Sequence, residues 1–318
     1  MRGRVTGMEP HVQWPGGKRF AFTIFDDTDS ATIANVGEIY ALLSDLGLRT
    51  TKTCWPLRGD VSKGKNAGHT CEDDDYRCWL QGLQAKGFEI GWHGATWHSS
   101  SREETIRGLD KFASLFGHDP RVAANHTGSA DGMYWAEKRM TGVNVLLYNL
   151  LTRMRHRGQY RGELPSDHHY WGDVCRDRVK YYRNFVFQDV NTLKACPLMP
   201  YHDRRRPLVN YWFSASNGVD LSRFNNCLSE KHQDQLEEEG GACIIYSHFA
   251  FGFQRQGTLD PRFRSLLERL ARKDGWFVPT STMLDQLLTV NGRREITPWQ
   301  RGRMERKWML EKITLGTT

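Results

Sequence analysis

Short apolar runs alternate with segments of helical periodicity along most of this 318-residue chain. Such alternation is typical of α/β folds, in which helices cover a parallel sheet. About seven strands favour a distorted (β/α) barrel, where functional side chains lie at the C-terminal ends of the strands. The expected strands are 20–25, 48–52, 88–91, 122–124, 143–147, 242–246 and 276–278, and the expected helices are 34–46, 76–86, 101–116, 228–239, 262–272, 281–288 and 298–313.

The length and composition predict one large domain with short appendages. A hydrophobic content of 39% with 12% aromatic residues suits a globular protein with a substantial core. Residues 148–215 look irregular, aromatic and basic, and we expect them to form an insert that sets specificity. The expected organisation is an N-terminal extension at 1–17, a catalytic domain at 18–290 that contains this insert, and a helical tail at 291–318.

The N-terminal segment and the cysteines both bear on the cellular compartment. Residues 1–17 are basic but lack the apolar core of a secretory signal, and no apolar stretch has the length of a membrane span, which predicts a cytoplasmic protein. Seven scattered cysteines are typical of reduced thiols. An alternative use is a structural zinc site, although the spacing matches no zinc module we can identify. That site would combine Cys54, His69, Cys71 and Cys78.

The net charge of +7 limits the classes of partner. A solvated basic surface explains it, and so does attraction to an anionic substrate such as a nucleotide-linked or lipid-phosphate-linked sugar. No nucleic-acid-binding module is recognisable, so we expect no nucleic-acid partner.

An acidic doublet stands where the first expected strand ends. Residues 20–29 have the sequence FAFTIFDDTD, so Asp26 and Asp27 directly follow the apolar run. Aspartate is depleted in strands and costly to bury unpaired. A bound metal ion explains two adjacent carboxylates here, and an Asp-rich turn is the alternative.

Three other expected strands also end in polar side chains, so four clusters should meet at one rim of the barrel. Two imidazoles and one carboxylate form an open site for a catalytic divalent ion, most often zinc, with Co, Ni, Mn and Fe as alternatives. A second carboxylate beside this site can act as a base, and a histidine opposite can protonate a leaving group. These groups suit metal-assisted hydrolysis of an amide or ester. The further clusters contain His93 and His98, Asn125 and His126, and His248.

These motifs resemble those of polysaccharide deacetylases of carbohydrate esterase family 4. Residues 23–28, TIFDDT, are similar to the T-F-D-D-G motif, which implies Asp26 as general base and Asp27 as metal ligand. Glu-Ile-Gly-Trp at 89–92, followed by His93, is similar to the start of the second motif, and the apolar run ending in His248 is similar to the last. The resemblance spans about residues 18–290 and implies the family's barrel, a metal cofactor and His248 as general acid.

The chain departs from the family pattern at several positions. The second histidine of the second motif, His98, stands five residues after His93 instead of four, so a bulge must correct it or His126 must supply the ligand. Thr28 replaces the usual glycine, and residues 124–128 lack the arginine that pairs with the base. The resemblance therefore indicates a divergent branch with a substrate other than chitin or peptidoglycan, in surface-polysaccharide or lipopolysaccharide biosynthesis.

Aromatic and polar residues in the expected insert suit sugar recognition, because a pyranose has apolar faces and hydroxyl edges. A buried aromatic core is the alternative. The expected function is removal of an acetyl or other acyl group from an amino sugar, a sugar nucleotide or a lipid-linked saccharide. An inactive carbohydrate-binding relative and a metal phosphoesterase are the competing hypotheses. The candidate substrate-binding residues are Trp171, Asp173, Arg183, Asn184 and Trp212.

Overall fold

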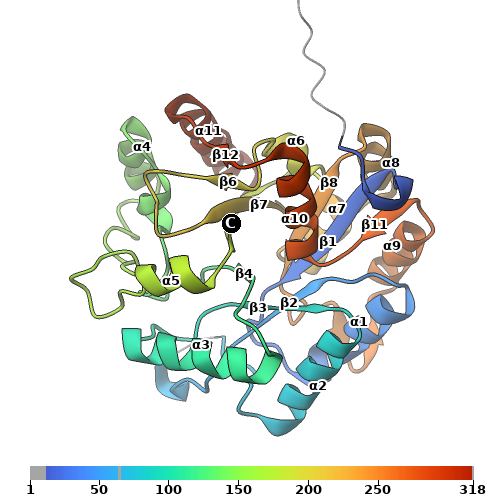
Figure 1. Ribbon diagram of the computed structural model, residues 1–318. Helices are drawn as coiled ribbons and strands as arrows, with labels where there is room; N and C mark the ends of the chain where they lie inside the picture. Colours follow the sequence, from blue (N-terminus) through green and yellow to red (C-terminus); the bar gives the residue numbers. More distant parts are fainter. Residues whose placement is uncertain (1–11, 64–65, 317–318) are drawn as a thin grey trace, which may run out of the picture.

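The computed structural model describes residues 12–63 and 66–316 and contains a closed barrel of seven parallel strands (Figure 1). Strands β1 to β5 pair in sequence order, β5 pairs with β7, β7 with β8, and β8 closes the ring on β1. The expected distorted (β/α) barrel is therefore confirmed. The barrel strands are β1 (Phe20–Asp26), β2 (Thr51–Cys54), β3 (Glu89–Trp92), β4 (Val122–Ala123), β5 (Tyr181–Phe187), β7 (Tyr211–Asn217) and β8 (Ala242–Ser247).

Short strands outside the ring extend the sheet at two places. Strand β11 (Gly275–Phe277) pairs in parallel with the first residues of β1, before β1 reaches β2. Strand β6 (Tyr201–His202) pairs antiparallel with β7, and β12 (Arg294–Glu295) pairs in parallel with β6. A separate small hairpin consists of β9 (Gln254–Arg255) and β10 (Thr258–Leu259).

Helices surround the barrel, and local sequence signals set many of their ends (Figure 1). For example, Ser101 and Glu104 form a reciprocal capping box, and Gly117 ends the same helix in the left-handed conformation. The helices are α1 (Ile33–Asp45), α2 (Asp74–Ala85), α3 (Arg102–Phe116), α4 (Val143–Leu151), α5 (Gly172–Arg178), α6 (Thr192–Ala195), α7 (Leu221–Cys227), α8 (Glu230–Glu239), α9 (Pro261–Ala271), α10 (Thr280–Asn291) and α11 (Pro298–Leu315), with 3-10 turns η1 (Pro15–Gly17), η2 (Val61–Lys63) and η3 (Ala136–Arg139).

Two expectations about the middle of the chain were wrong. The segment 143–147, expected as a strand, is the start of α4, because a short apolar run does not by itself distinguish a strand from a helix. The segment 148–215, expected to be irregular, contains β5 and β7, two of the seven barrel strands. Both strands carry polar residues inside the fold, such as Arg183 in β5 and Ser214 in β7, and this interrupts the apolar pattern.

Helix α11 packs on the barrel through buried polar contacts as well as apolar ones. Trp308 is fully buried, and Glu305 accepts hydrogen bonds from Thr141 and Asn144. The Asp203 carboxylate binds both Arg206 and Arg301, the latter from the first turns of α11. The tail is thus fastened to the barrel by charge as well as by packing.

Replacing Asp203 with asparagine is expected to lower the free energy of unfolding by about 2 kcal/mol at neutral pH, because buried Arg301 loses its counter-charge and buried Arg206 keeps only Glu305, 3.8 Å away. Burial raises the pKa of Asp203, but Arg301 and Arg206 outweigh it and hold that pKa below the ordinary 3.8. A carboxyl group whose pKa is lowered by folding stabilises the folded state at pH values above its unfolded pKa. This stabilisation is lost as the pH falls through the folded-state pKa. The difference between wild type and Asp203→Asn in urea unfolding should therefore shrink below about pH 4. A difference independent of pH would contradict this account.

Candidate active site

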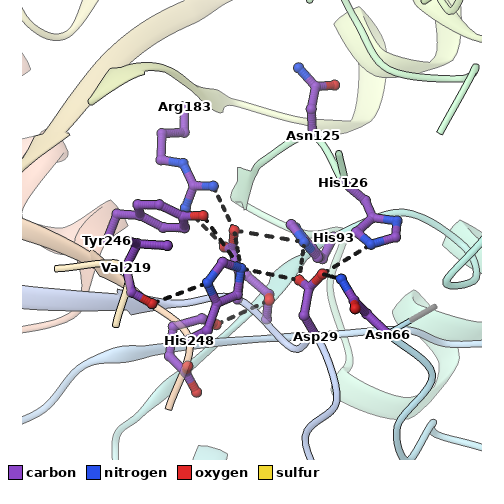
Figure 2. A network of polar contacts seen from close by, with 12 residues as sticks. Asp29, Asn66, His93, Asn125, His126, Arg183, Val219, Tyr246 and His248 are labelled. Carbon is purple, nitrogen blue, oxygen red and sulfur yellow. Dashed lines mark hydrogen bonds and ion pairs between the residues drawn. The ribbon is translucent and has the colours of Figure 1, made fainter. Parts of the chain in front are cut away.

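The polar clusters meet at Asp29, just beyond the end of β1 (Figure 2). Its Oδ2 atom lies 2.9 Å from Nε2 of His93 and 3.4 Å from Nε2 of His248. Its Oδ1 atom lies 3.0 Å from Nε2 of His126, and the Asn66 amide donates a hydrogen bond of 3.2 Å to the same oxygen. The three imidazoles follow β3, β4 and β8, so residues far apart in the sequence surround one buried carboxylate.

The neighbouring Asp27 carboxylate is held by a buried arginine. Nη1 and Nη2 of Arg183, from β5, donate to its two oxygens at 2.8 and 2.6 Å. The guanidinium also stacks on the Phe25 and Tyr246 rings, which fixes its position. A planar arginine that binds both oxygens of a carboxylate orients it as well as neutralising it. Arg183 is therefore the arginine that pairs with the acidic doublet, through Asp27, whereas residues 124–128 contain none.

The charges of the site reinforce one another. Burial raises the pKa of Asp29, but its imidazole partners outweigh burial and hold that pKa well below the ordinary value. Burial likewise opposes ionisation of Asp27, yet Arg183 and His93 keep its pKa low. Burial lowers the pKa of His248, but Asp29 and Asp27 raise it overall. Both aspartates are thus carboxylates at neutral pH, and His248 is inclined to carry a proton.

Asp26, expected as the general base, faces the other way. Successive side chains of a strand point to opposite sides. Phe25 points toward Arg183 inside the barrel, so Asp26 points outward to α1. There its carboxylate lies 2.9 Å from Nζ of Lys52 and accepts hydrogen bonds from the Tyr40 hydroxyl and the Phe249 amide. Asp26 does not line the cavity described below, and this placement corrects the expected role.

The expected ligand His98 also lies away from the site. Its ring Nδ1 is 2.9 Å from the carbonyl oxygen of the next residue, Ser99, and it does not line the cavity. His126 also does not line the cavity, but its Nε2 atom lies 3.0 Å from Oδ1 of Asp29, whereas no contact of His98 with Asp29 is present among the described residues. Asn125 does line the cavity, but its side-chain oxygen accepts hydrogen bonds from the Met133 amide and the Tyr182 hydroxyl.

Of the five expected substrate-binding residues, only Arg183 reaches the cavity. Trp171 is buried and donates to the carbonyl of Asp131, and Asp173 pairs with Arg102 near the surface. Asn184 and Trp212 are buried and do not line the cavity either. These four placements correct the expected roles. The buried aromatic residues belong to the core, which was the stated alternative.

A cavity of about 220 Å³ opens over the two aspartates. Beyond them its wall is cationic, because η3 contributes Arg139 and α11 contributes Lys312.

Sequence reasoning missed both residues, and it also missed Asp29. For Asp29 a signal existed, since it stands two residues after Asp27 in the same acidic segment that follows the apolar run. For Arg139 and Lys312, which come from elements outside the barrel, no local motif offered one.

The donor atoms at the cavity floor fit a divalent cation. One ligand atom each from Asp27, Asp29 and His248 lie within 4.8 Å of one another, and all three residues are buried. His93 and His126 bring two further imidazole nitrogens to Asp29. Carboxylate and neutral imidazole are ligands for zinc and for neighbouring first-row metals. The alternative zinc site is not supported, because no metal-competent group among the described residues includes Cys54, His69, Cys71 or Cys78.

The sequence matches no protein-family model and no curated protein. The structure does match solved chains, among them a protein of Mycobacterium smegmatis assigned as a polysaccharide deacetylase. The TM-score is 0.53 at 13% identity, over 90% of this chain and 96% of the other. The chain has the polysaccharide deacetylase fold. Also similar are Puue Allantoinase (TM-score 0.49, 14% identity, 89% and 95% covered) and a Pseudomonas aeruginosa PAO1 protein assigned to the polysaccharide deacetylases (0.47, 14%, 88% and 95%).

Within this polysaccharide deacetylase fold, five barrel strands contribute to the site. The chain positions Asp27 and Asp29 after β1, His93 after β3, His126 after β4, Arg183 on β5 and His248 after β8. All but Arg183 lie just beyond a C-terminal strand end, where parallel barrels carry their chemistry.

Proposed function

We propose that this protein is a metal-dependent deacetylase that removes an acetyl or other acyl group from an amino sugar. The observation that carries the proposal is the arrangement around Asp29. Three imidazoles converge on that carboxylate beside a second carboxylate that Arg183 orients, and a cavity opens above them. Amide hydrolysis needs a Lewis acid, a base and an acid within reach of one carbonyl, and this set can supply all three.

Asp29, His93 and His126 would hold the divalent cation, with zinc as the first choice and Co, Ni, Mn or Fe as alternatives. This trio differs from the group Asp27, Asp29 and His248, whose ligand atoms lie within 4.8 Å of one another. We prefer the trio because both oxygens of Asp27 are already engaged by Arg183. The cation would supply polarisation of the acyl carbonyl and a lower pKa for a water molecule. His98, originally proposed as the third ligand, is replaced by His126.

Asp27 is then the general base and His248 the general acid. The carboxylate of Asp27 takes a proton from the attacking water as the new carbon–oxygen bond forms. The imidazolium of His248 gives a proton to the nitrogen as the carbon–nitrogen bond breaks, so acetate and a free amine leave. Arg183 keeps Asp27 ionised and correctly turned, and His248 is fixed by the Val219 carbonyl 3.3 Å from its Nδ1.

The cationic wall of the cavity favours a substrate that carries negative charge. Arg139 is buried between the Trp135 and Trp308 rings, and no carboxylate of the described residues lies within ion-pair distance of it. Its Nε atom has no hydrogen-bond partner in the described structure. Burial lowers the pKa of Arg139 to about 10 and that of Lys312 to about 8. A phosphate group would compensate this buried charge.

A lipid-phosphate-linked amino sugar or a sugar nucleotide combines the acyl group with that anion. Such compounds are intermediates in building surface polysaccharides or lipopolysaccharide, and we place the reaction there. The cationic side chains of the cavity wall would, by themselves, suit a metal phosphoesterase equally well. The deacetylase remains preferred because the described metal-competent residues form one cluster, whereas phosphate transfer between two metals needs a second.

Replacing Arg139 with glutamine is expected to raise KM for N-acetylglucosamine 1-phosphate about tenfold, since a charge-assisted hydrogen bond is lost. KM for neutral N-acetylglucosamine should hardly change. The matched control is Lys307→Gln, which removes a cation from α11 outside this cavity. Equal rises in KM for both sugars would show that Arg139 supports the fold and does not bind an anion.

The decisive experiment is to purify the protein, quantify its bound metal and measure acetate release from acetylated amino sugars, sugar nucleotides and lipid-linked sugars. Acetate release that depends on metal supports the deacetylase. Phosphate release without acetate would replace it with a phosphoesterase. Sugar binding without metal or turnover would make the protein an inactive carbohydrate-binding relative.

A further inference from the structure

Helix α4 carries its apolar residues on the side that faces solvent. They recur at intervals of three and four residues, so they form one helical stripe. The opposite side, with Asn144 and Tyr148, is buried. A helix on an ordinary protein surface shows the reverse arrangement. The stripe, with exposed fractions from 43% to 75%, consists of Val143, Leu146, Leu147, Leu150 and Leu151, and Met154, just past the end of α4, is also exposed.

The segment that continues α4 is strongly basic. Residues 143–162 contain four arginines and no acidic residue. Arg153, Arg155 and Arg157 are exposed, and none of them forms an ion pair with another described residue. Exposed leucines therefore stand next to unpaired positive charge. We call the apolar stripe together with these three arginines the docking face.

The docking face lies on elements that also line the active-site cavity. Tyr148 of α4 and His156 of the basic segment line that cavity, as does Lys312 of α11. The two helices are adjacent, since the Tyr148 and Trp308 rings stack at 6.1 Å and Asn144 donates to Glu305 (Figure 1). The last turns of α11 add exposed apolar side chains of their own, Leu310, Ile313 and Leu315.

We propose that the docking face binds the surface of an anionic lipid bilayer. Apolar side chains entering the acyl boundary and arginines at the headgroups are the two parts of interfacial membrane binding. None of the helices in the described part of the chain is long and apolar enough to cross a membrane. Binding would therefore lie in the plane of the interface. The positive charge of the docking face favours an anionic bilayer over a second copy of the protein. Apolar contact between two copies would bring the arginines of both copies together.

Docking would bring the cavity to the lipid headgroups. If the proposed function holds, the enzyme would take its acylated sugar from a lipid-phosphate carrier at the membrane surface, with the cavity cations beside the phosphate. This consequence rests on the proposed deacetylase activity, whereas the membrane binding itself does not.

The test is co-sedimentation of the full chain with vesicles of phosphatidylcholine alone and of phosphatidylcholine mixed with phosphatidylglycerol. Wild type should bind the mixed vesicles, and Leu146→Ser/Leu150→Ser should bind them at least about tenfold more weakly. Arg153→Gln/Arg155→Gln should lose the preference for the anionic lipid. Val290→Ser, at an exposed apolar position of α10, and Lys231→Gln/Arg255→Gln, at exposed cations elsewhere, are the matched controls and should bind as wild type.

Several outcomes would overturn the proposal. They are absence of vesicle binding by wild type, binding that Leu146→Ser/Leu150→Ser leaves intact, and a wild-type dimer in light scattering that this variant abolishes. The Asp29→Asn variant separates the two proposals, because it should still bind vesicles. Membrane binding without acetate release would leave the docking face standing and remove only the deacetylase.

Discussion

The Asp29→Asn variant is expected to lose tight metal binding and to release acetate about a thousandfold more slowly than wild type. Asp29 is the carboxylate that all three site imidazoles approach, at 2.9, 3.0 and 3.4 Å. An amide in its place removes the negative charge on which a divalent cation depends, and it can present only one oxygen. Metal stoichiometry by elemental analysis and acetate release by a coupled assay would measure the two losses.

Asp27→Asn provides the matched comparison, because it makes the same oxygen-to-nitrogen replacement in the neighbouring carboxylate. If Asp27 is the base, this variant should keep most of its metal while the rate falls by at least about a hundredfold, with the acidic limb of the pH–rate profile changed. Arg183 would then face an amide instead of a carboxylate. The opposite result, metal lost in Asp27→Asn and retained in Asp29→Asn, would return Asp27 to the ligand role that the family motif implied.

The sequence could predict the rim of the barrel but not which side chains point into it. The sequence expected His93, His126 and His248 to follow strands that share one edge, and the structure places all three around Asp29. The choice between Asp26 and Asp27 depended on the alternation of β1. The motif identifies the acidic pair by residue type alone and says nothing about side-chain direction. In the structure, β1 directs Asp26 toward α1 and leaves Asp27 and Asp29 inside the barrel.

The arginine partner of Asp27, the proposed base, could not be found by local pattern. The family motif supplies it from the segment after the fourth strand, and here it comes from Arg183 in the middle of β5. A buried arginine in a strand resembles a break in the apolar pattern, which is why β5 was not expected to be a strand at all. The charge of Arg183 that obscured the strand also orients the Asp27 carboxylate, so one residue accounts for both errors.

The cationic wall depends on long-range packing, which a single sequence does not show. Lys312 is 285 positions after Asp27 in the numbering and reaches the cavity only because α11 folds back over the barrel. Helix α4 shows that an apolar pattern does not by itself indicate burial. Its leucines predicted a buried strand, but they form an exposed helical stripe. Periodicity identifies which residues share a face, and only the tertiary structure shows what that face meets.

Asp26→Asn is expected to lower the free energy of unfolding by about 3–5 kcal/mol, because it leaves the ammonium group of Lys52 buried without its counter-charge. Both side chains are fully buried, and their charged atoms lie 2.9 Å apart. Burial raises the pKa of Asp26, and Lys52 opposes that shift only in part. The attraction between the two groups therefore mainly compensates the cost of burying their charges. Urea unfolding followed by tryptophan fluorescence would measure the loss.

The double variant Asp26→Leu/Lys52→Met should recover most of that stability, since apolar residues of similar volume often replace a buried ion pair without cost. It also decides the role of Asp26 in catalysis. Asp26 lies outside the cavity, so a folded double variant should bind metal and release acetate at rates close to wild type. A stable, metal-loaded double variant without activity would mean that Asp26 is the base after all, and that the outward orientation of its side chain changes when substrate binds.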